Sequence, residues 1–214
     1  MTRLTTDLPR ALRLTALMAA LAGSVLAAGC AAPILVGGAM VGTAFAVTDR
    51  RTGGAQVEDE AIELKTITRV REAIGERGHV NATSYNRSVL ITGEVPSEAD
   101  KQAVEQAIAR IENVRSTVNE LALVGNSSLT SRTNDGVLTS KVKATFIDAK
   151  DLQSNAIKVV TERGTVYLMG IVTEREAARA AELARSVGGV TKVVRVFQVI
   201  SEAELAQIQP PAKK

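Results

Sequence analysis

An internal repeat constrains the fold of this chain more than any other feature. Residues 89–95 (VLITGEV) and 166–172 (VYLMGIV) are β-rich runs that both place glycine fifth, and both lead into a helical pattern. Self-similar segments of this kind indicate that one structural unit occurs more than once. We therefore expect the chain to fold as two copies of a small domain.

The elements around the two glycine runs also agree between the copies. Each run is preceded by a strand and a turn, and is followed by a capping-box pattern, a helix with an apolar stripe of 3.6-residue period, and a last strand. An earlier helix carries Ile67, Val70 and Ile74 in the first copy and Leu138, Val142 and Phe146 in the second. The predicted order is αββαβ, which gives two α+β domains, each a small three-stranded sheet packed by two helices.

These patterns also predict the domain boundaries. The first domain covers residues 58–124, the second covers 134–201, and residues 125–133 form the linker. Residues 30–57 contain a glycine-rich apolar stretch with a polar exit, which we interpret as a tether; a second membrane-inserting segment is the alternative. We expect the tail at 202–214 to be flexible.

The first 29 residues have the three parts of a secretory signal peptide. Three arginines precede an uncharged apolar run, which ends in the sequence LAAGC at residues 26–30. This ending resembles the lipobox of bacterial lipoproteins, and Cys30 is the single cysteine of the chain. We expect Cys30 to carry a covalent lipid rather than to be a buried thiol of an uncleaved anchor. Ala31 and Ala32 include no aspartate, which favours the outer membrane, with the domains facing the periplasm.

Composition argues against nucleic-acid binding and against catalysis. The net charge is +3, of which the signal supplies +2, and the chain has two tyrosines, three phenylalanines and no tryptophan for base stacking. The single histidine, His79, follows Gly78 in a predicted solvated loop. Gly93 and Gly170 are typical of strand bulges or close packing rather than of phosphate loops. We expect no enzyme activity, no small-molecule substrate, no metal and no cofactor besides the lipid on Cys30.

The repeated unit resembles the BON domain of bacterial envelope proteins. The second copy carries the pattern best, in residues 166–176 (VYLMGIVTERE) and in the GVTKVV segment at 189–194. The first copy is looser, because Glu112, Asn113 and Val114 stand where the motif has glycine and valine. The resemblance implies binding of anionic phospholipid by the second domain, support of outer-membrane integrity and a link to the machinery that assembles outer-membrane β-barrel proteins.

The charge of the two copies supports a lipid role for the second. Residues 58–124 contain eight Lys or Arg against twelve Asp or Glu, whereas residues 134–200 contain ten against seven. A basic domain is attracted to an anionic membrane surface. Within the first helix of the second copy we select one candidate phospholipid-binding set: Val137, Leu138, Lys141, Val142 and Lys143.

Two alternatives remain open for this helix and for the protein. Leu138, Val142 and Phe146 can instead form a core stripe with the lysines in solvent. In the proteins that the chain resembles, an aromatic side chain at the position of Val137 dips into the bilayer. The protein can also be an interaction scaffold for β-barrel assembly through its acidic first domain, or a periplasmic stress protein.

Overall fold

The computed structural model describes residues 49–125 and 127–209. The predicted signal peptide, Cys30, the tether up to residue 48 and the tail from residue 210 lie outside the described residues.

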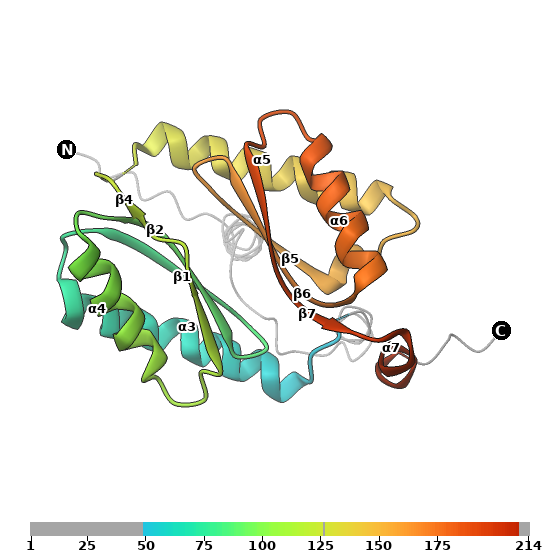
Figure 1. The fold of residues 1–214 in the computed structure, drawn as a ribbon, viewed down its shortest axis with the longest axis horizontal. Helices are drawn as coiled ribbons and strands as arrows, with labels where there is room; N and C mark the ends of the chain where they lie inside the picture. Colours follow the sequence, from blue (N-terminus) through green and yellow to red (C-terminus); the bar gives the residue numbers. More distant parts are fainter. Residues whose placement is uncertain (1–48, 126, 210–214) are drawn as a thin grey trace, which may run out of the picture. The chain divides into compact units, whose positions relative to one another are not determined.

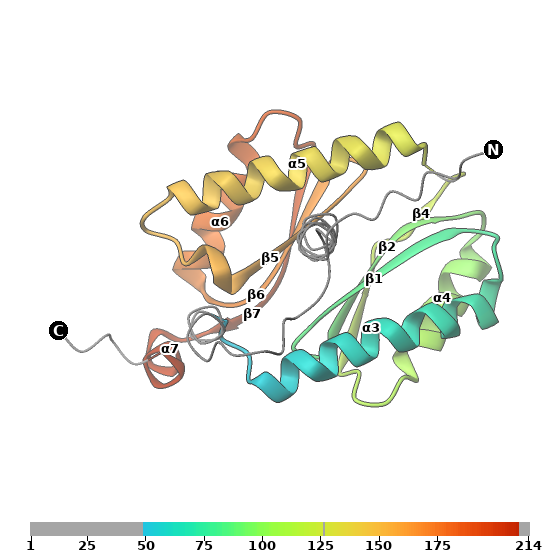
Figure 2. The same ribbon diagram turned by 180° about the vertical axis from the view of Figure 1, so that it is seen from behind.

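The first repeat is a small mixed sheet covered on one face by two helices (Figures 1 and 2). Strand β2 pairs antiparallel with β1 and parallel with β3, and the short β4 also pairs with β2. In chain order the elements are α3 (Gly53–Ile74), β1 (His79–Tyr85), β2 (Ser88–Val95), α4 (Glu98–Ala109), β3 (Ser116–Asn119) and β4 (Ala122–Leu123).

The second repeat has the same αββαβ order, with two short helices, η1 and α7, in addition. Strand β6 is central, antiparallel to β5 and parallel to β7, and α5 and α6 cover one face. The elements are α5 (Leu129–Asp148), the short 3-10 helix η1 (Ser154–Ala156), β5 (Ile157–Glu162), β6 (Thr165–Thr173), α6 (Glu174–Ser186), β7 (Lys192–Ile200) and α7 (Glu202–Ile208).

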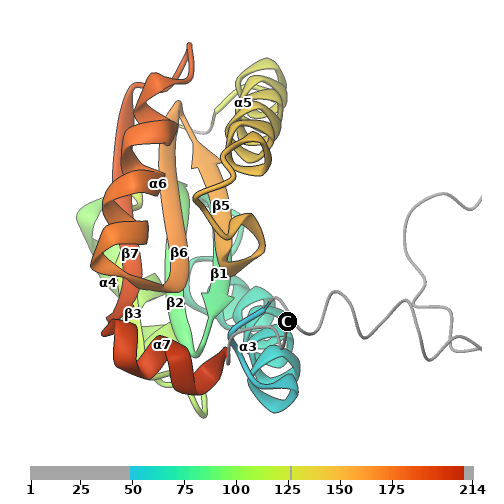
Figure 3. The same cartoon turned by 90° about the vertical axis from the view of Figure 1, so that its right-hand side faces the viewer.

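The predicted αββαβ order and the α+β class are confirmed, but several predicted boundaries differ from the structure. Helix α3 begins five residues before the predicted start of the first domain, and α5 begins inside the predicted linker. Each start is fixed by a side-chain cap: Thr52 accepts a hydrogen bond from the Ala55 N–H, and Ser128 accepts one from the Ser131 N–H. The predicted flexible tail contains α7, which follows β7 directly (Figure 3). Ser201 and Glu204 form a complete capping box at its start.

Each repeat has its own apolar core between the helices and the sheet. The predicted stripes of α4 and α6 are buried except for Ala103, Ala107 and Val187, which are half-buried. The valines on the helix-facing side of β2 and β6 are also buried. One predicted core position is wrong: Ile67 is 60% exposed, and Ile62 on the same helix is fully buried. Helix α3 has apolar residues on more than one side, so its periodicity alone does not identify the buried face.

The opposite faces of the two sheets also contain apolar residues, and these form a third cluster shared by both repeats. Side chains at alternate strand positions point to the same face. Tyr85 and Leu90 of the first repeat thereby join Tyr167, Met169 and Ile171 of the second. The two repeats therefore share a buried contact and are not independent modules on a flexible linker.

The fifth-position glycines of the repeat allow a close backbone approach in both sheets. A Cβ atom on Gly93 would lie 2.0 Å from the carbonyl oxygen of His79, and one on Gly170 would lie 2.4 Å from that of Ala156. Gly93 also has a φ of 116°, which L side chains rarely adopt. These contacts confirm the close-packing interpretation of both glycines.

Candidate functional site

The predicted phospholipid-binding residues divide between two faces of α5. Leu138 and Val142 are buried in the core of the second repeat, as is Phe146. Their inclusion in the membrane-facing set is therefore wrong, because their side chains pack under the helix against the sheet. Val137, Lys141 and Lys143 are exposed.

The outward side of α5 carries two exposed apolar residues, Leu129 and Ile147, that the sequence does not predict to lie there. Leu129 is 80% exposed, Val137 51% and Ile147 70%. At 100° per residue these three lie within one sector of the helix, and Lys141 and Lys143 lie on its two borders. We call these five residues the outer face of α5. They combine apolar side chains with two cations on a surface that the core does not use.

A buried aspartate organises the hairpin turn in each repeat. The carboxylate of Asp59 accepts hydrogen bonds from the backbone N–H groups of Asn86 and Arg87, both at 2.7 Å. Both turn residues have positive φ, 49° and 65°, as a two-residue type I′ hairpin requires. The carboxylate of Asp135 accepts in the same way from the N–H groups of Arg163 and Gly164, both at 2.8 Å.

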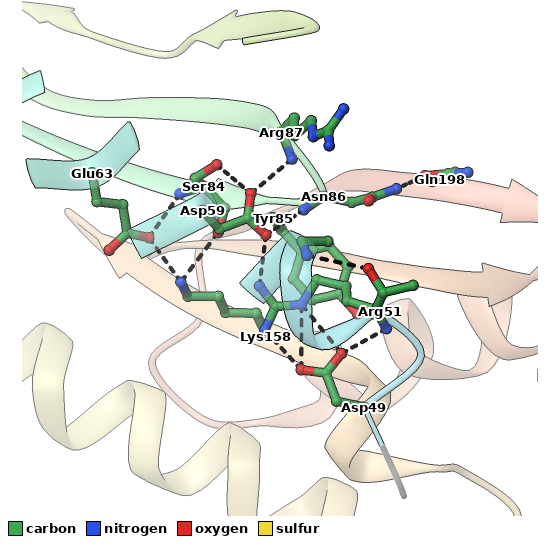
Figure 4. A network of polar contacts seen from close by, with 12 residues as sticks. Asp49, Arg51, Asp59, Glu63, Ser84, Tyr85, Asn86, Arg87, Lys158 and Gln198 are labelled. Carbon is green, nitrogen blue, oxygen red and sulfur yellow. Dashed lines mark hydrogen bonds and ion pairs between the residues drawn. The ribbon is translucent and has the colours of Figure 1, made fainter. Parts of the chain in front are cut away.

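The first described residues, Asp49 to Arg51, dock onto both repeats. Arg51 donates to Asp59 at 2.8 Å and to Asp49 at 2.7 Å, and its guanidinium lies 4.3 Å from the ring centre of Tyr85 (Figure 4). Both guanidinium contacts with carboxylates are charge-assisted hydrogen bonds. The sequence predicts that this stretch is the polar exit of a tether, whereas the structure makes it part of the folded unit.

Arg50 holds the same segment to the second repeat. Its guanidinium donates to both carboxylate oxygens of Glu176 at 2.7 Å and to the carbonyl oxygen of Ile171 at 2.8 Å. The two side chains are 2% and 6% exposed. Glu176 also completes the capping box of α6 with Thr173.

Further polar contacts cross from one repeat to the other beside this segment (Figure 4). Lys158 donates to Glu63 at 3.0 Å, and the Asn86 side-chain amide donates to the Gln198 side-chain carbonyl at 2.7 Å. Burial raises the pKa of Tyr85 to about 12, so its hydroxyl stays neutral. This hydroxyl donates to the carbonyl oxygen of Ala156 at 3.4 Å.

Two buried carboxyl groups have pKa values below their ordinary range. Burial opposes ionisation of Asp59, but hydrogen bonds from Ser84, Arg87, Arg51 and Asn86 together outweigh it. For Glu176, burial is likewise outweighed by the hydrogen bonds from Arg50 and from the Thr173 N–H. Both groups are therefore ionised at neutral pH in the folded protein.

These lowered pKa values predict a loss of stability in acid. The unfolded chain takes up protons at these groups more readily than the folded one, so their contribution is complete above the unfolded pKa of about 4. It is lost as the pH falls toward the folded values. Denaturant unfolding between pH 3 and 7 should show a free energy of unfolding that is nearly flat above pH 5 and falls below pH 4. An equal free energy at pH 3 and pH 6 would contradict this assignment.

His79 does not lie in the solvated loop that the sequence suggested. It is the first residue of β1, directly opposite Glu94 on β2. Its Nδ1 atom is buried between the two sheets. Gly78 before it suggests a loop, and no short sequence pattern around His79 indicates this burial.

Two repeats of an αββαβ unit, each with a fifth-position glycine and a capped second helix, define a protein of the BON class. The BON domain model matches residues 62–125 and 134–201, and the chain belongs to this family. Within the described part of the chain, no helix is both long and apolar enough to cross a membrane.

The chain is also similar to individual proteins of this class. It is 36% identical to the outer membrane lipoprotein DolP of Haemophilus influenzae over 183 residues, which are 84% of this chain and 93% of the relative. It is 29% identical to a 21 kDa hemolysin of Actinobacillus pleuropneumoniae over 154 residues, 71% of this chain and 79% of the relative. A solved structure of CdsD, from the type III secretion system of Chlamydia trachomatis, covers 69% of this chain and 99% of its own at 9% identity. Its TM-score is 0.28, too low to establish a shared fold.

Proposed function

We propose that this protein is a non-catalytic outer-membrane lipoprotein, anchored by a lipid on Cys30, which binds anionic phospholipid through its second repeat and supports outer-membrane integrity. The similarity to a named outer membrane lipoprotein over most of both chains supports the location. The lipobox-like sequence before Cys30 supports the anchor. Two or more acyl chains are needed for stable attachment, as in bacterial lipoproteins.

The single observation that carries the lipid role is the outer face of α5. Its exposed apolar residues can enter the interface of a bilayer while Lys141 and Lys143 remain at the level of the anionic headgroups. Each basic residue held near such a surface contributes about 1 kcal/mol. The surrounding repeat has an excess of basic residues, whereas the first repeat has an excess of acidic ones.

A flotation experiment with vesicles tests this role. The full chain with Cys30→Ser, which removes the acyl anchor, should bind phosphatidylglycerol vesicles more tightly than phosphatidylcholine vesicles, and added salt should weaken binding. Reversing both lysines, Lys141→Glu with Lys143→Glu, should weaken binding at least about tenfold, since it replaces two attractions with two repulsions. The whole chain is used because an isolated second repeat would expose Tyr167, Met169 and Ile171.

Helix α3 supplies the matched control for this experiment. Leu64 is 68% exposed on the acidic repeat, so Leu64→Asp changes an apolar surface residue without touching α5. This variant should bind anionic vesicles as the parent chain does. Equal binding to both vesicle types, or insensitivity to the double lysine reversal, would refute the lipid role of α5.

A second candidate function rests on the exposed side of α3 itself. Val57, Leu64 and Ile67 are all at least 60% exposed on this helix of the acidic repeat. Apolar residues of this kind suit a protein partner, and the candidate partner is the machinery that assembles outer-membrane β-barrel proteins. Site-specific crosslinking from position 64 in intact cells should capture a protein of that machinery; recovery of no protein adduct would count against it.

A further inference from the structure

A cluster of ionisable groups lies at one end of the contact between the two sheets. His79 begins β1, Glu94 is its direct cross-strand partner on β2, and Glu162 ends β5 of the second repeat. One ligand atom from each lies within 4.8 Å of the other two. The cluster therefore takes two residues from one repeat and one from the other.

Glu94 has an environment that an ionised carboxylate rarely tolerates alone. It is 0% exposed, and neither of its oxygens has a hydrogen-bond partner among the described residues. His79 Nδ1 lies 3.5 Å from one of these oxygens, and Nη1 of the Arg163 guanidinium lies 3.7 Å from the other. His79 Nδ1 is likewise buried and unpaired within the described part of the chain. Both contacts are longer than a charge-assisted hydrogen bond, so the two buried oxygens of Glu94 remain available to a bound cation.

Glu162 adds a second buried carboxyl group at the same place. One of its oxygens, Oε2, accepts a hydrogen bond from the Asn81 side-chain amide at 3.1 Å, which orients the group. Burial and the negative charges of Glu94 and Asp135 raise its pKa, against opposing effects of Asn81 and His79. The cluster thus combines two carboxyl groups and one imidazole nitrogen in a buried space.

We propose that His79, Glu94 and Glu162 bind one divalent transition-metal ion of the zinc type, which joins the two repeats. An imidazole nitrogen and carboxylate oxygens are a donor set that Zn²⁺ accepts, with bonds of about 2.0–2.2 Å. Such bonds place neighbouring ligands of a tetrahedral site about 3.4 Å apart. The His79 Nδ1 to Glu94 Oε2 distance of 3.5 Å already matches this spacing. Rotation of the Glu162 side chain brings one of its oxygens to the same spacing from the other two ligand atoms. Asn81 keeps its hydrogen bond to the other oxygen of Glu162 as an outer-shell partner.

The Arg163 guanidinium competes with the metal ion for the Glu94 carboxylate, but it can move away from that carboxylate when the ion binds. Its side chain is 44% exposed, so the guanidinium can turn into solvent when the ion neutralises Glu94. Asp135 binds the backbone N–H of Arg163 rather than the guanidinium, which leaves the turn in place during that movement. Asp135 itself is occupied by two backbone hydrogen bonds and is not a further ligand.

Zinc titration of the full chain, purified without a histidine tag and treated with EDTA, tests the proposal. Calorimetry should give one Zn²⁺ per chain, and a hundredfold excess over Kd should raise Tm by about 5–10 °C. Mg²⁺, which prefers an octahedral shell of oxygen ligands, should have no such effect. Glu94→Gln keeps the size and shape of the buried side chain and should fold, and it should weaken Zn²⁺ binding at least about a hundredfold because the carboxylate ligand is lost.

Two further variants make the outcome decisive. Glu162→Gln should remove the zinc-dependent rise in Tm, and it carries the test alone if Glu94→Gln fails to fold. Glu63→Gln, a carboxyl group that also contacts the other repeat but lies outside the cluster, should retain the rise. No zinc-dependent change in Tm of the parent chain, or full binding by Glu162→Gln, would overturn the proposal and leave a proton shared among the three groups.

Discussion

Replacing Asp59 with alanine is expected to lower the free energy of unfolding by about 3–5 kcal/mol, the usual cost of removing one partner from a buried ion pair. The side chain is 2% exposed and accepts four hydrogen bonds. Its loss leaves Arg51 without this partner, and leaves the N–H groups of Asn86 and Arg87 unpaired in a turn with positive φ. Urea unfolding followed by circular dichroism measures the change.

Two comparisons separate the ion pair from the turn. Asp135→Ala removes the equivalent turn acceptor of the second repeat, which has no arginine side-chain partner among residues 49–125 and 127–209, and should cost about 1–3 kcal/mol. Glu60→Ala, one residue from Asp59 but exposed, should change stability by less than about 0.5 kcal/mol. Equal effects of Asp59→Ala and Glu60→Ala would show that the turn does not depend on the buried carboxylate.

Arg50→Ala is the second substitution from which we expect a large effect, again about 3–5 kcal/mol. It leaves Glu176 ionised and buried without its bidentate partner, and it frees the segment that leads toward Cys30. Denaturant unfolding measures the loss of stability. Trypsin cleavage after Arg51 provides a local measurement, since the rate should rise with the population in which this segment is undocked.

Helix α6, which contains Glu176, also supplies the control for this substitution. Arg175 is 63% exposed and lies 3.6 Å from Glu202, so Arg175→Ala removes a surface ion pair of small value. The free energy of unfolding of Arg50→Lys should lie between those of Arg50→Ala and Arg175→Ala, because an ammonium group keeps the charge but loses the two parallel hydrogen bonds. Parent-like stability and trypsin resistance of Arg50→Ala would mean that the segment is held by other contacts.

Local sequence patterns predicted most of the fold. Interactions between residues a few positions apart determine the hairpins, the capped second helices and the glycine-bearing strands. Each of these patterns occurs in both repeats, so each copy supports the prediction for the other. Failures occurred where sequence leaves a choice. Helix α3 has apolar residues on several sides. Its sequence pattern therefore predicts Ile67 in the core, whereas the structure buries Ile62. Helix α7 was not predicted, because Pro210 and Pro211 follow it and proline does not continue a helix.

The polar contacts that organise the site could not be read from the sequence. Arg50 and Glu176 are 126 positions apart, and Asn81 and Glu162 are 81 apart. No periodicity or short motif links residues at such separations, because their meeting depends on how the two sheets pack. The outer face of α5 was found only in part for the same reason, since the core decides which of its residues remain outside.

The docking of Asp49 to Arg51 on both repeats changes the geometry of attachment. Along the sequence, the first repeat stands between Cys30 and the second repeat. This order suggests that the second repeat, the proposed lipid-binding domain, lies farthest from the anchor. Arg50 holds the chain to the second repeat directly, and only nineteen residues, 31–49, separate it from Cys30. Fully extended, they reach at most about 70 Å. If the proposed anchoring and the proposed lipid binding both hold, this short connection keeps the outer face of α5 at a high effective concentration near the bilayer, so that weak contacts suffice for binding.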